Sequence, residues 1–331
     1  MKIKWITALL GYYGFGNLGD ELLALSAINQ LEKLGISRDE IMVLTASSDF
    51  YSELGVNSVN RWNLPKVGSV LRESKTLLLG GGGIFQSVTS LRSCFYYWSV
   101  IEMASFAGAV PWAVSQSIGP FSGKLGRFLA KTALSKCKIL EVRDDSSKKA
   151  ADELGLKSER GEDLVFGLNL KPDYKSKGSY ILVNFRNWKE TDEFISSVRD
   201  YVNNNSFSSI GVAMSPDDLF FIKFAQKKYK INFSDIILVK NWEEACDLWS
   251  KSVEAIGIRL HFSLVSLLFG LKQMLFVYDP KVDCFAKRWG IPVWNKEDAH
   301  VKPEIASVST ENVSDMVTAN FSRCARKVIN L

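Results

Sequence analysis

The sequence has few of the residues that build metal centres or disulfide frameworks. Its 331 residues include only two histidines, His261 and His300. The five cysteines are odd in number and widely scattered, whereas disulfide frameworks and zinc sites need closer or paired spacing. We therefore expect free thiols in a reducing, cytoplasmic compartment, and no bound metal ion.

Strong charge of one sign and long apolar runs are also lacking. The net charge is only +5, and no arginine-rich run or basic-aromatic platform occurs, which excludes nucleic acid as a partner. The longest apolar stretch, residues 261–271, is too short to span a bilayer. Peripheral contact with the inner face of a membrane stays an open alternative. The apolar start, MKIKWITALL, runs into a glycine-rich turn, so we expect a buried strand rather than a signal peptide.

Short β-branched apolar runs alternate with segments of helical periodicity, a pattern typical of a parallel sheet covered on both faces. Apolar residues make up 47% of the chain, enough for sizeable cores. Strands are expected at residues 3–10, 41–45, 76–79, 110–115 and 139–142, and again at 180–185, 210–214, 236–239, 253–258 and 274–277. Helices are expected at residues 20–34, 94–108, 123–135, 146–154, 190–203, 216–228, 243–250, 262–270 and 284–289.

The alternation lapses once, at residues 169–179, where a polar segment with proline and glycine predicts a linker. We therefore expect two Rossmann-like, doubly wound α/β domains, residues 1–168 and 180–308, with a cleft between them. A final helix over residues 309–331 is expected to fold back onto the first domain. In such sheets ligands bind where loops leave the carboxyl ends of strands.

The first glycine-rich turn, GYYGFGNLGDE, has the GxGxxG spacing of a dinucleotide-binding fingerprint. Asp20 and Glu21 oppose that interpretation, because acidic residues at a helix amino terminus would repel a pyrophosphate. The ribose-binding acid expected about 20 residues later is also missing. Two other interpretations stand beside it: a tight turn capped by Asp20, or a substrate-facing turn in which Asn17 and Asp20 contact hydroxyls. The three glycines are Gly14, Gly16 and Gly19.

Two further turns follow predicted strands. In LLLGGGGIFQS, Gly81 and Gly82 lack side chains, so backbone amides could approach a ligand closely. A flexible loop without a ligand is the alternative, and no GK[ST] follows to make a P-loop. In SQSIGPF, Gln116 and Ser117 follow a strand, where they line the expected cleft or belong to a structural Gly-Pro turn.

Several basic side chains also follow predicted strands. Each has a structural alternative: an Arg-Asp surface pair for Arg143, a core histidine for His261, a solvated lysine for Lys281. Taken together, basic groups at strand exits suggest a small ligand with several negative charges. The set is Arg143, Arg186, Arg259, His261 and Lys281.

Six segments occur in the order found in polysaccharide pyruvyltransferases: GYYGFGNLGDELLALSAI, LLLGGGGIFQSVTSLRSCFYY, SQSIGPF, VRDDSS, GIRLHFSL and YDPKV. The sequence resembles the bacterial ketal-forming type over residues 3–292. The resemblance implies two Rossmann-like domains arranged like a B-type glycosyltransferase. It also implies a phosphoenolpyruvate donor and a cell-surface polysaccharide or precursor as acceptor, whose O4 and O6 become bridged by a pyruvate ketal. Ser117 stands where many relatives have glycine, which leaves the acceptor sugar open.

Site residues follow by motif position and from the strand exits. The resemblance implies donor binding and catalysis for Arg143, His261 and Lys281, and contacts of the first turn for Asn17 and Asp20. No cofactor is implied beyond phosphoenolpyruvate as co-substrate. The expected donor-binding set is Arg143, Lys281, Arg259, His261, Gly81 and Gly82, and the expected acceptor-binding set is Asn17, Asp20, Gln116 and Arg186.

The expected chemistry is protonation of the donor's methylene carbon, attack by one sugar hydroxyl, and loss of phosphate as the second hydroxyl closes the ketal. His261 is the expected general acid, since histidine titrates near neutral pH. Asp20 is either a base or only a hydrogen-bonding group. Three rival functions are a nucleotide-sugar glycosyltransferase of the same architecture, a non-catalytic carbohydrate-binding protein and a dinucleotide-dependent oxidoreductase. Lipid linkage of the acceptor and the oligomeric state stay open.

Overall fold

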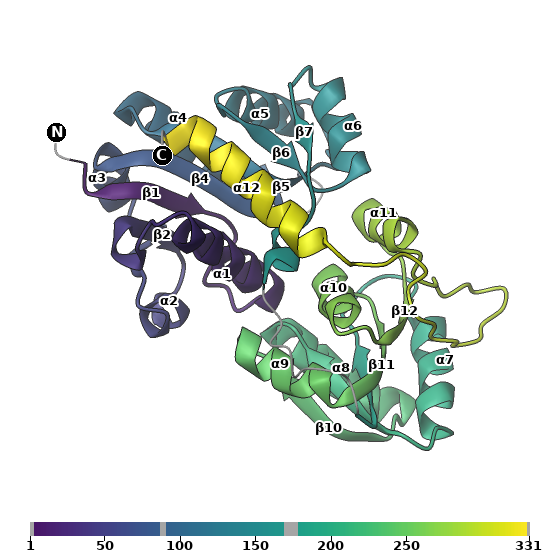
Figure 1. The fold of residues 1–331 in the computed structure, drawn as a ribbon. Helices are drawn as coiled ribbons and strands as arrows, with labels where there is room; N and C mark the ends of the chain where they lie inside the picture. Colours follow the sequence, from purple (N-terminus) through teal and green to yellow (C-terminus); the bar gives the residue numbers. More distant parts are fainter. Residues whose placement is uncertain (1–2, 87–90, 169–177, 330–331) are drawn as a thin grey trace. The chain divides into compact units, whose positions relative to one another are not determined.

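The computed structural model describes residues 3–86, 91–168 and 178–329 (Figure 1). The linker predicted at residues 169–179 lies outside the described residues, apart from its last two. The chain folds into two compact units, each with its own parallel sheet. The first unit comprises Met1–Phe15, Asp20–Leu168 and Asn312–Leu331, and the second comprises Gly16–Gly19 and Asn169–Glu311.

The first unit contains a seven-stranded parallel sheet in the order β3-β2-β1-β4-β5-β6-β7. Its central strands are buried on both faces, as their continuous apolar sequences require: all five residues of β2 are buried. The chain runs outward to β3 in one direction and, from β4, to β7 in the other, so the topological switch lies between β1 and β4. The strands are β1 (Trp5–Leu10), β2 (Ile41–Thr45), β3 (Asn57–Asn60), β4 (Ser74–Phe85), β5 (Val110–Ile118), β6 (Leu140–Val142) and β7 (Glu159–Arg160).

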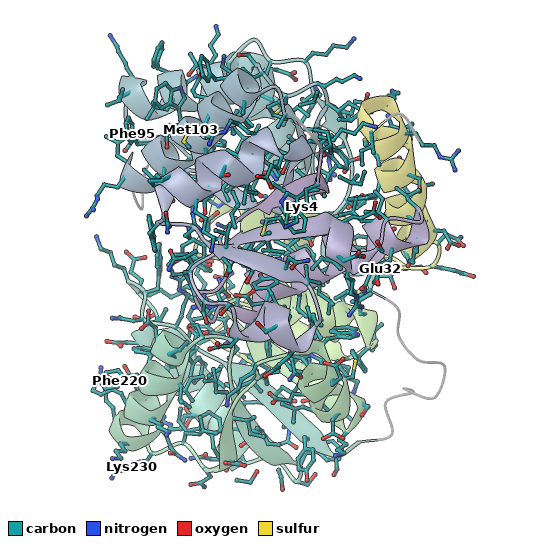
Figure 2. All side chains as sticks on the ribbon, turned by 90° about the vertical axis from the view of Figure 1, so that its left-hand side faces the viewer. Lys4, Glu32, Phe95, Met103, Phe220 and Lys230 are labelled. Carbon is teal, nitrogen blue, oxygen red and sulfur yellow. The ribbon has the colours of Figure 1, made fainter. Side chains whose placement is uncertain are left out.

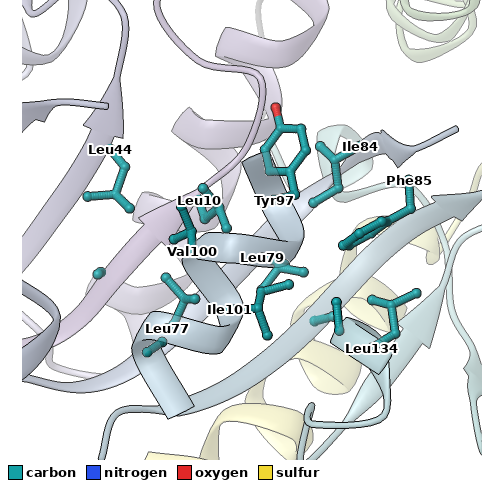
Figure 3. Close-up of a cluster of buried hydrophobic side chains, with 14 of the residues drawn as sticks. Leu10, Leu44, Leu77, Leu79, Ile84, Phe85, Tyr97, Val100, Ile101 and Leu134 are labelled. Carbon is teal, nitrogen blue, oxygen red and sulfur yellow. The ribbon is translucent and has the colours of Figure 1, made fainter. Parts of the chain in front are cut away.

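Helices cover both faces of this sheet. Helix α4 places Tyr97, Val100 and Ile101 against Leu77 and Leu79 of β4 in the main core cluster (Figure 3). Helix α12 packs on the strands β4 and β5 and on the short helix η2. The helices are α1 (Leu18–Lys33), η1 (Arg38–Glu40), α2 (Asp49–Glu53), α3 (Leu64–Arg72), α4 (Leu91–Ala107), α5 (Lys124–Leu134), α6 (Asp145–Glu153), η2 (Leu164–Gly167) and α12 (Val313–Ile329).

Several features of the first unit differ from expectation. Strand β5 runs to Ile118, so Gln116 and Ser117 lie within it and do not follow it. The helices α2 and α3 and the short strand β7 were not expected. Strand β4 does not end at Leu79: it continues through the glycines and pairs Gly80 with Val114 and Gly82 with Gln116. The turn expected at residues 80–83 is therefore wrong, because glycine favours loops intrinsically but the flanking strand β5 supplies the pairing. Strand β3, with the sequence NSVN, was not expected because it contains a single apolar residue.

The second unit contains a five-stranded parallel sheet in the order β10-β9-β8-β11-β12, with its switch between β8 and β11. Helix α10 is apolar nearly all round and is correspondingly buried. The strands are β8 (Tyr180–Asn184), β9 (Ser208–Ala213), β10 (Phe233–Leu238), β11 (Ser252–Gly257) and β12 (Lys272–Leu275). The helices are α7 (Asp192–Asn203), α8 (Pro216–Tyr229), α9 (Trp242–Ser250), α10 (Leu260–Leu268) and α11 (Pro280–Trp289).

The predicted fold class, two doubly wound parallel-sheet α/β domains, is confirmed. The apolar start of the chain forms the inner strand β1, as expected. Over the described parts of the chain, no helix combines the length and apolar character that crossing a bilayer requires.

Candidate functional site

Most of the predicted site residues follow the strands that flank the two topological switches. In the first unit, Asn17 and Asp20 follow β1, and Gly82 lies near the end of β4. In the second unit, Arg186 follows β8, while His261 follows β11. Ligands of open α/β sheets bind outside the carboxyl ends of strands at such points. Each unit therefore presents a candidate ligand-binding edge of its own.

Glu21, near the start of α1, stabilises the turn after β1 through hydrogen bonds. The Glu21 carboxylate accepts hydrogen bonds from the Gly14 backbone N–H at 2.8 Å and from the Tyr51 hydroxyl at 2.5 Å. Burial raises the pKa of Glu21 from 4.5 to about 7, although both hydrogen bonds act in the opposite direction. Gly14 has φ +79°, and a β-carbon there would lie 2.2 Å from Oγ1 of Thr45. These contacts give Gly14 and Glu21 a structural role in the turn.

The glycines of β4 have no side chains, so the β1–α1 turn and the start of α1 pack closely against the sheet. A β-carbon on Gly80 would lie 2.5 Å from the Tyr13 hydroxyl, and one on Gly82 would lie 3.3 Å from Oδ1 of Asp20. The side chain of Asp20 therefore lies against the bare backbone of Gly82. The structure brings together two predicted site residues that are far apart in sequence. It also gives the glycines a packing role, which a freely flexible loop would not have.

Arg143 lies in a buried ionic cluster at the exit of β6. Its side chain donates to Oδ2 of Asp163 at 2.5 Å and to Oγ of Ser117 at 2.8 Å, and Oδ2 of Asp144 is 3.9 Å away. Arg143 is only 7% exposed, so the surface Arg-Asp pair considered from the sequence is wrong as to burial, while the pairing with aspartate is present. The carboxylates of Asp163 and Asp144 compensate the positive charge of this buried arginine.

Gln116, predicted to contact the acceptor, uses its side-chain nitrogen within the sheet. Nε2 donates to the backbone oxygens of Leu79 at 3.0 Å and Val114 at 3.1 Å. In the part of the chain that is described, its buried Oε1 meets no hydrogen-bond partner. The preceding residue, Ser115, has φ +54°, an uncommon conformation for a residue with a side chain. Gln116 therefore connects β4 and β5 within the sheet.

A buried aromatic cluster around Arg61 was not anticipated from the sequence. Arg61 follows β3 and is 2% exposed. Its NH1 atom donates to the Gly11 backbone oxygen at 2.8 Å, and its guanidinium carbon lies 4.3 Å from the ring centroid of Tyr96 and 5.3 Å from that of Tyr97. The sequence carries one signal for it, an arginine directly after a strand, but NSVN contains too few apolar residues to indicate that strand.

In the second unit, Arg259 is held by a buried carboxylate. Its Nε and NH2 atoms donate to Asp218 at distances of 2.9 Å and 2.6 Å, and NH2 also donates to Oγ of Ser215 at 3.0 Å. The Arg259 backbone N–H donates to Oδ1 of Asn184, at the end of β8, at 3.1 Å. Arg259 therefore ties the turn between β11 and α10 to strand β8 and helix α8. Its charge is compensated by Asp218.

His261 is the second residue of α10 and is partly exposed. The segment Gly16–Gly19 groups with this unit, and the Leu18 N–H donates to the Met214 oxygen at 2.9 Å. A β-carbon on Gly19 would lie 2.1 Å from Nδ1 of His261. Glycine at residue 19 therefore lets the imidazole lie directly against the main chain.

Arg186 and Lys281 belong to the same edge of the second sheet. Arg186 donates to the Tyr278 hydroxyl at 3.0 Å, and its guanidinium carbon lies 5.2 Å from the ring centroids of both Tyr278 and Trp188. Lys281 is the second residue of α11, and its Nζ lies 3.6 Å from Oδ2 of Asp279. Asp279 also caps that helix by accepting from the Lys281 N–H. The contact between Arg186 and Tyr278 joins segments that follow β8 and β12, on either side of β11.

The described residues contain no group of three or more His, Cys, Asp or Glu side chains that could hold a metal ion.

Comparisons with known proteins agree with the fold and point to a family. The sequence model described as "Polysaccharide pyruvyl transferase" matches residues 17–280. No protein of curated function matches the sequence. Among solved structures, the UDP-GlcNAc 2-epimerase from Methanocaldococcus jannaschii is similar at 12% identity, over 98% of this chain and 100% of that one, with a TM-score of 0.61. S. aureus MnaA, solved with UDP, is similar at 12% identity over 99% and 98% of the two chains, also with a TM-score of 0.61.

A third similar structure is Anabaena HepE in complex with UDP-glucose, at 11% identity over 98% of this chain and 95% of that one, with a TM-score of 0.55. At such low identity these likenesses establish the fold alone. The epimerases share the fold of B-type glycosyltransferases, which is the fold class expected from the sequence.

Proposed function

The chain belongs to the polysaccharide pyruvyl transferase family, and we propose that it transfers pyruvate from phosphoenolpyruvate to a sugar of a cell-surface polysaccharide or its precursor. The product would be a 4,6-linked pyruvate ketal, with phosphate released. The observation that carries this proposal is the family match over residues 17–280, which covers the first turn from Asn17 onward, the RLH segment and the first three residues of the YDPKV segment.

His261 lies at the start of helix α10, where an anionic donor would bind favourably. The amino terminus of α10 favours negative charge beside it, and a phosphorylated donor supplies that charge. In the proposed reaction, protonated His261 gives its proton to the methylene carbon of phosphoenolpyruvate, and positive charge develops on the adjacent carbon. A sugar hydroxyl oxygen bonds to that carbon and loses its proton to a base, which leaves a tetrahedral phosphate adduct.

The second hydroxyl then bonds to the same carbon as the carbon–oxygen bond to phosphate breaks. The second hydroxyl proton leaves with the phosphate or with solvent, so one donor and one diol yield one ketal and one phosphate. Asp20 is the proposed partner of an acceptor hydroxyl, as base or as hydrogen-bond acceptor. Its position against Gly82, where no side chain intervenes, supports a role beside a bound ligand.

Different cations receive different roles in this proposal. Lys281 is proposed to bind the donor's anionic groups, because its amine is held only loosely by Asp279 at 3.6 Å. Arg143 is proposed to contact the donor from within its cluster, since an arginine oriented by Asp163 and Ser117 presents a fixed planar group. Arg259 is reassigned: its bidentate pairing with Asp218 supports a role in positioning the turn that carries His261, in place of donor binding.

Gln116 and Arg186 were expected to bind the acceptor. Gln116 keeps only its carbonyl oxygen for that purpose, since its amide nitrogen bonds the main chain. Arg186 lies beside two aromatic rings that contact each other, Trp188 and Tyr278, an arrangement that supports stacking of a sugar beside it. Because phosphoenolpyruvate is an intracellular metabolite, the proposal sets the reaction in the cytoplasm. A lipid-linked acceptor would bring the enzyme to the inner face of the membrane.

The test is an assay of phosphate release. The protein is incubated with phosphoenolpyruvate and a panel of pyranosides with free 4- and 6-hydroxyls, and product is followed by mass spectrometry as addition of a pyruvyl ketal. A parallel reaction contains UDP-glucose without phosphoenolpyruvate, because transfer from a nucleotide sugar is the rival suggested by the fold. Acceptor-dependent phosphate release supports pyruvyl transfer, and UDP release in its place overturns it.

A further inference from the structure

Three aromatic rings form a connected, partly exposed surface at the carboxyl edge of the first sheet. Tyr12 and Phe15, in the turn after β1, are stacked with ring centroids 4.2 Å apart and planes 15° apart. Trp62, after β3, meets Phe15 edge-on at 6.5 Å. Tyr12 is 42% exposed and Trp62 is 58% exposed. We call these three residues the aromatic platform.

Scattered exposed rings are ordinary on protein surfaces. Phe220, which is 80% exposed, projects in this way from the second unit (Figure 2). The aromatic platform is different because its rings touch one another and come from two separate strand exits. Rings held in contact at the ligand-binding edge of a parallel sheet are placed to act together.

The buried guanidinium of Arg61 contacts two rings of the aromatic platform. Its central carbon is 5.2 Å from the ring centroid of Phe15 and 5.2 Å from that of Trp62. Within the described residues its buried Nε–H meets no hydrogen-bond partner. Burying a guanidinium with an unmet donor is costly, and the surrounding ring faces compensate it by cation–π attraction. Contact with Phe15 and Trp62 therefore holds both rings against one buried cation.

We propose that the aromatic platform is an acceptor subsite, on which a pyranose ring of the saccharide stacks through its apolar C–H face. The inference rests on the proposed function only for the identity of that saccharide as acceptor. Support comes from position: the platform shares the β1–α1 turn with Asn17 and Asp20, the residues proposed to contact sugar hydroxyls. Exposed rings beside such polar groups match the two-sided character of a sugar.

Two other occupants fit the surface less well. A stable protein partner needs about 800 Å² on each side, far more than three partly exposed rings offer. An anionic lipid surface calls for a cluster of exposed lysine or arginine side chains around the apolar groups. Arg61 is buried, and the segment from Trp62 through the first turn of α3 has a single exposed basic residue, Lys66. Binding to anionic vesicles that the Trp62→Ala variant abolishes, without any glycan binding, would overturn the saccharide assignment.

The experiment measures saccharide binding without phosphoenolpyruvate. Full-length protein is applied to an immobilised array of pyranose oligosaccharides that includes cellobiose, lactose and N,N′-diacetylchitobiose, and the strongest ligand is titrated by calorimetry. The Trp62→Ala variant is expected to bind about tenfold more weakly, the effect of losing one aromatic stacking contact. Trp62→Phe, which keeps a ring, should retain most of the affinity.

The matched control is Phe128→Ala, because Phe128 is also 58% exposed and lies in the same unit, on α5. It should bind like the wild type. The proposal is overturned if the wild type binds no glycan, or if Trp62→Ala binds as tightly as Phe128→Ala. Glycan binding that depends on Trp62, with no phosphate release from phosphoenolpyruvate, leaves the subsite standing and overturns the proposed function instead.

Discussion

Arg259 and Asp218 form a two-pronged ion pair, with nitrogen–oxygen distances of 2.9 Å and 2.6 Å, around a carboxylate that is 1% exposed. The pair joins the turn before α10 to the start of α8, and His261 is two residues beyond the arginine. From the sequence, an arginine beside apolar segments indicated an anionic partner. That partner is present inside the protein, so the arginine positions the turn.

Replacing Arg259 with alanine should therefore destabilise the protein more than it affects donor binding. Removing one member of a buried pair leaves the other charge uncompensated, at a cost of about 3–5 kcal/mol. Urea unfolding would measure the loss. The control is Arg199→Ala, which breaks an exposed pair with Asp200 and should change the unfolding free energy by less than about 1 kcal/mol. Wild-type stability of Arg259→Ala together with a raised KM for phosphoenolpyruvate would restore the donor-binding role.

The close approach of Gly19 to His261 predicts a selective loss of activity in Gly19→Ala. The added carbon would lie 2.1 Å from Nδ1, so the imidazole must move. Displacing a catalytic group by about 1 Å can cost a hundredfold in rate, so we expect kcat to fall by roughly that factor. Gly123→Ala is the control, since a β-carbon there meets nothing within 4 Å. Unchanged kcat in Gly19→Ala would mean that the position of His261 is not critical.

Glu21 predicts how stability depends on pH. Burial raises the pKa of Glu21 from 4.5 to about 7, so the folded protein holds a proton that the unfolded chain releases between those values. The native state is therefore favoured below about pH 4.5, and this contribution is lost as pH rises towards 7. The difference corresponds to about 3 kcal/mol.

In urea titrations across that range, Glu21→Gln should lose this part of the decline in unfolding free energy. Glu141, in β6, has a pKa raised by burial to about 7 as well, so Glu141→Gln should remove a separate part. A Glu21→Gln profile parallel to that of the wild type would show that folding does not raise the pKa of Glu21.

The sequence predicts the inner strands well because their apolar runs leave little choice: β2 begins and ends at the expected residues. It predicts the strand exits and hence the positions of Arg143, Arg186 and His261. It does not predict partners, because Asp163 and Asp218 are distant in the chain from the arginines that they bind. The continuation of β4 through glycines, and the strand β3 that carries Arg61, depend on pairing with neighbouring strands that local patterns do not contain.

The central claim concerns pyruvyl transfer with His261 as general acid, and the chain supplies its own control. His300, the other histidine, has a side chain that is 84% exposed. The decisive measurement is acceptor-dependent phosphate release from phosphoenolpyruvate by the wild type, His261→Ala and His300→Ala. We predict release by the wild type and by His300→Ala, and a rate lower by about a hundredfold or more in His261→Ala. Turnover by His261→Ala at the wild-type rate would contradict the account.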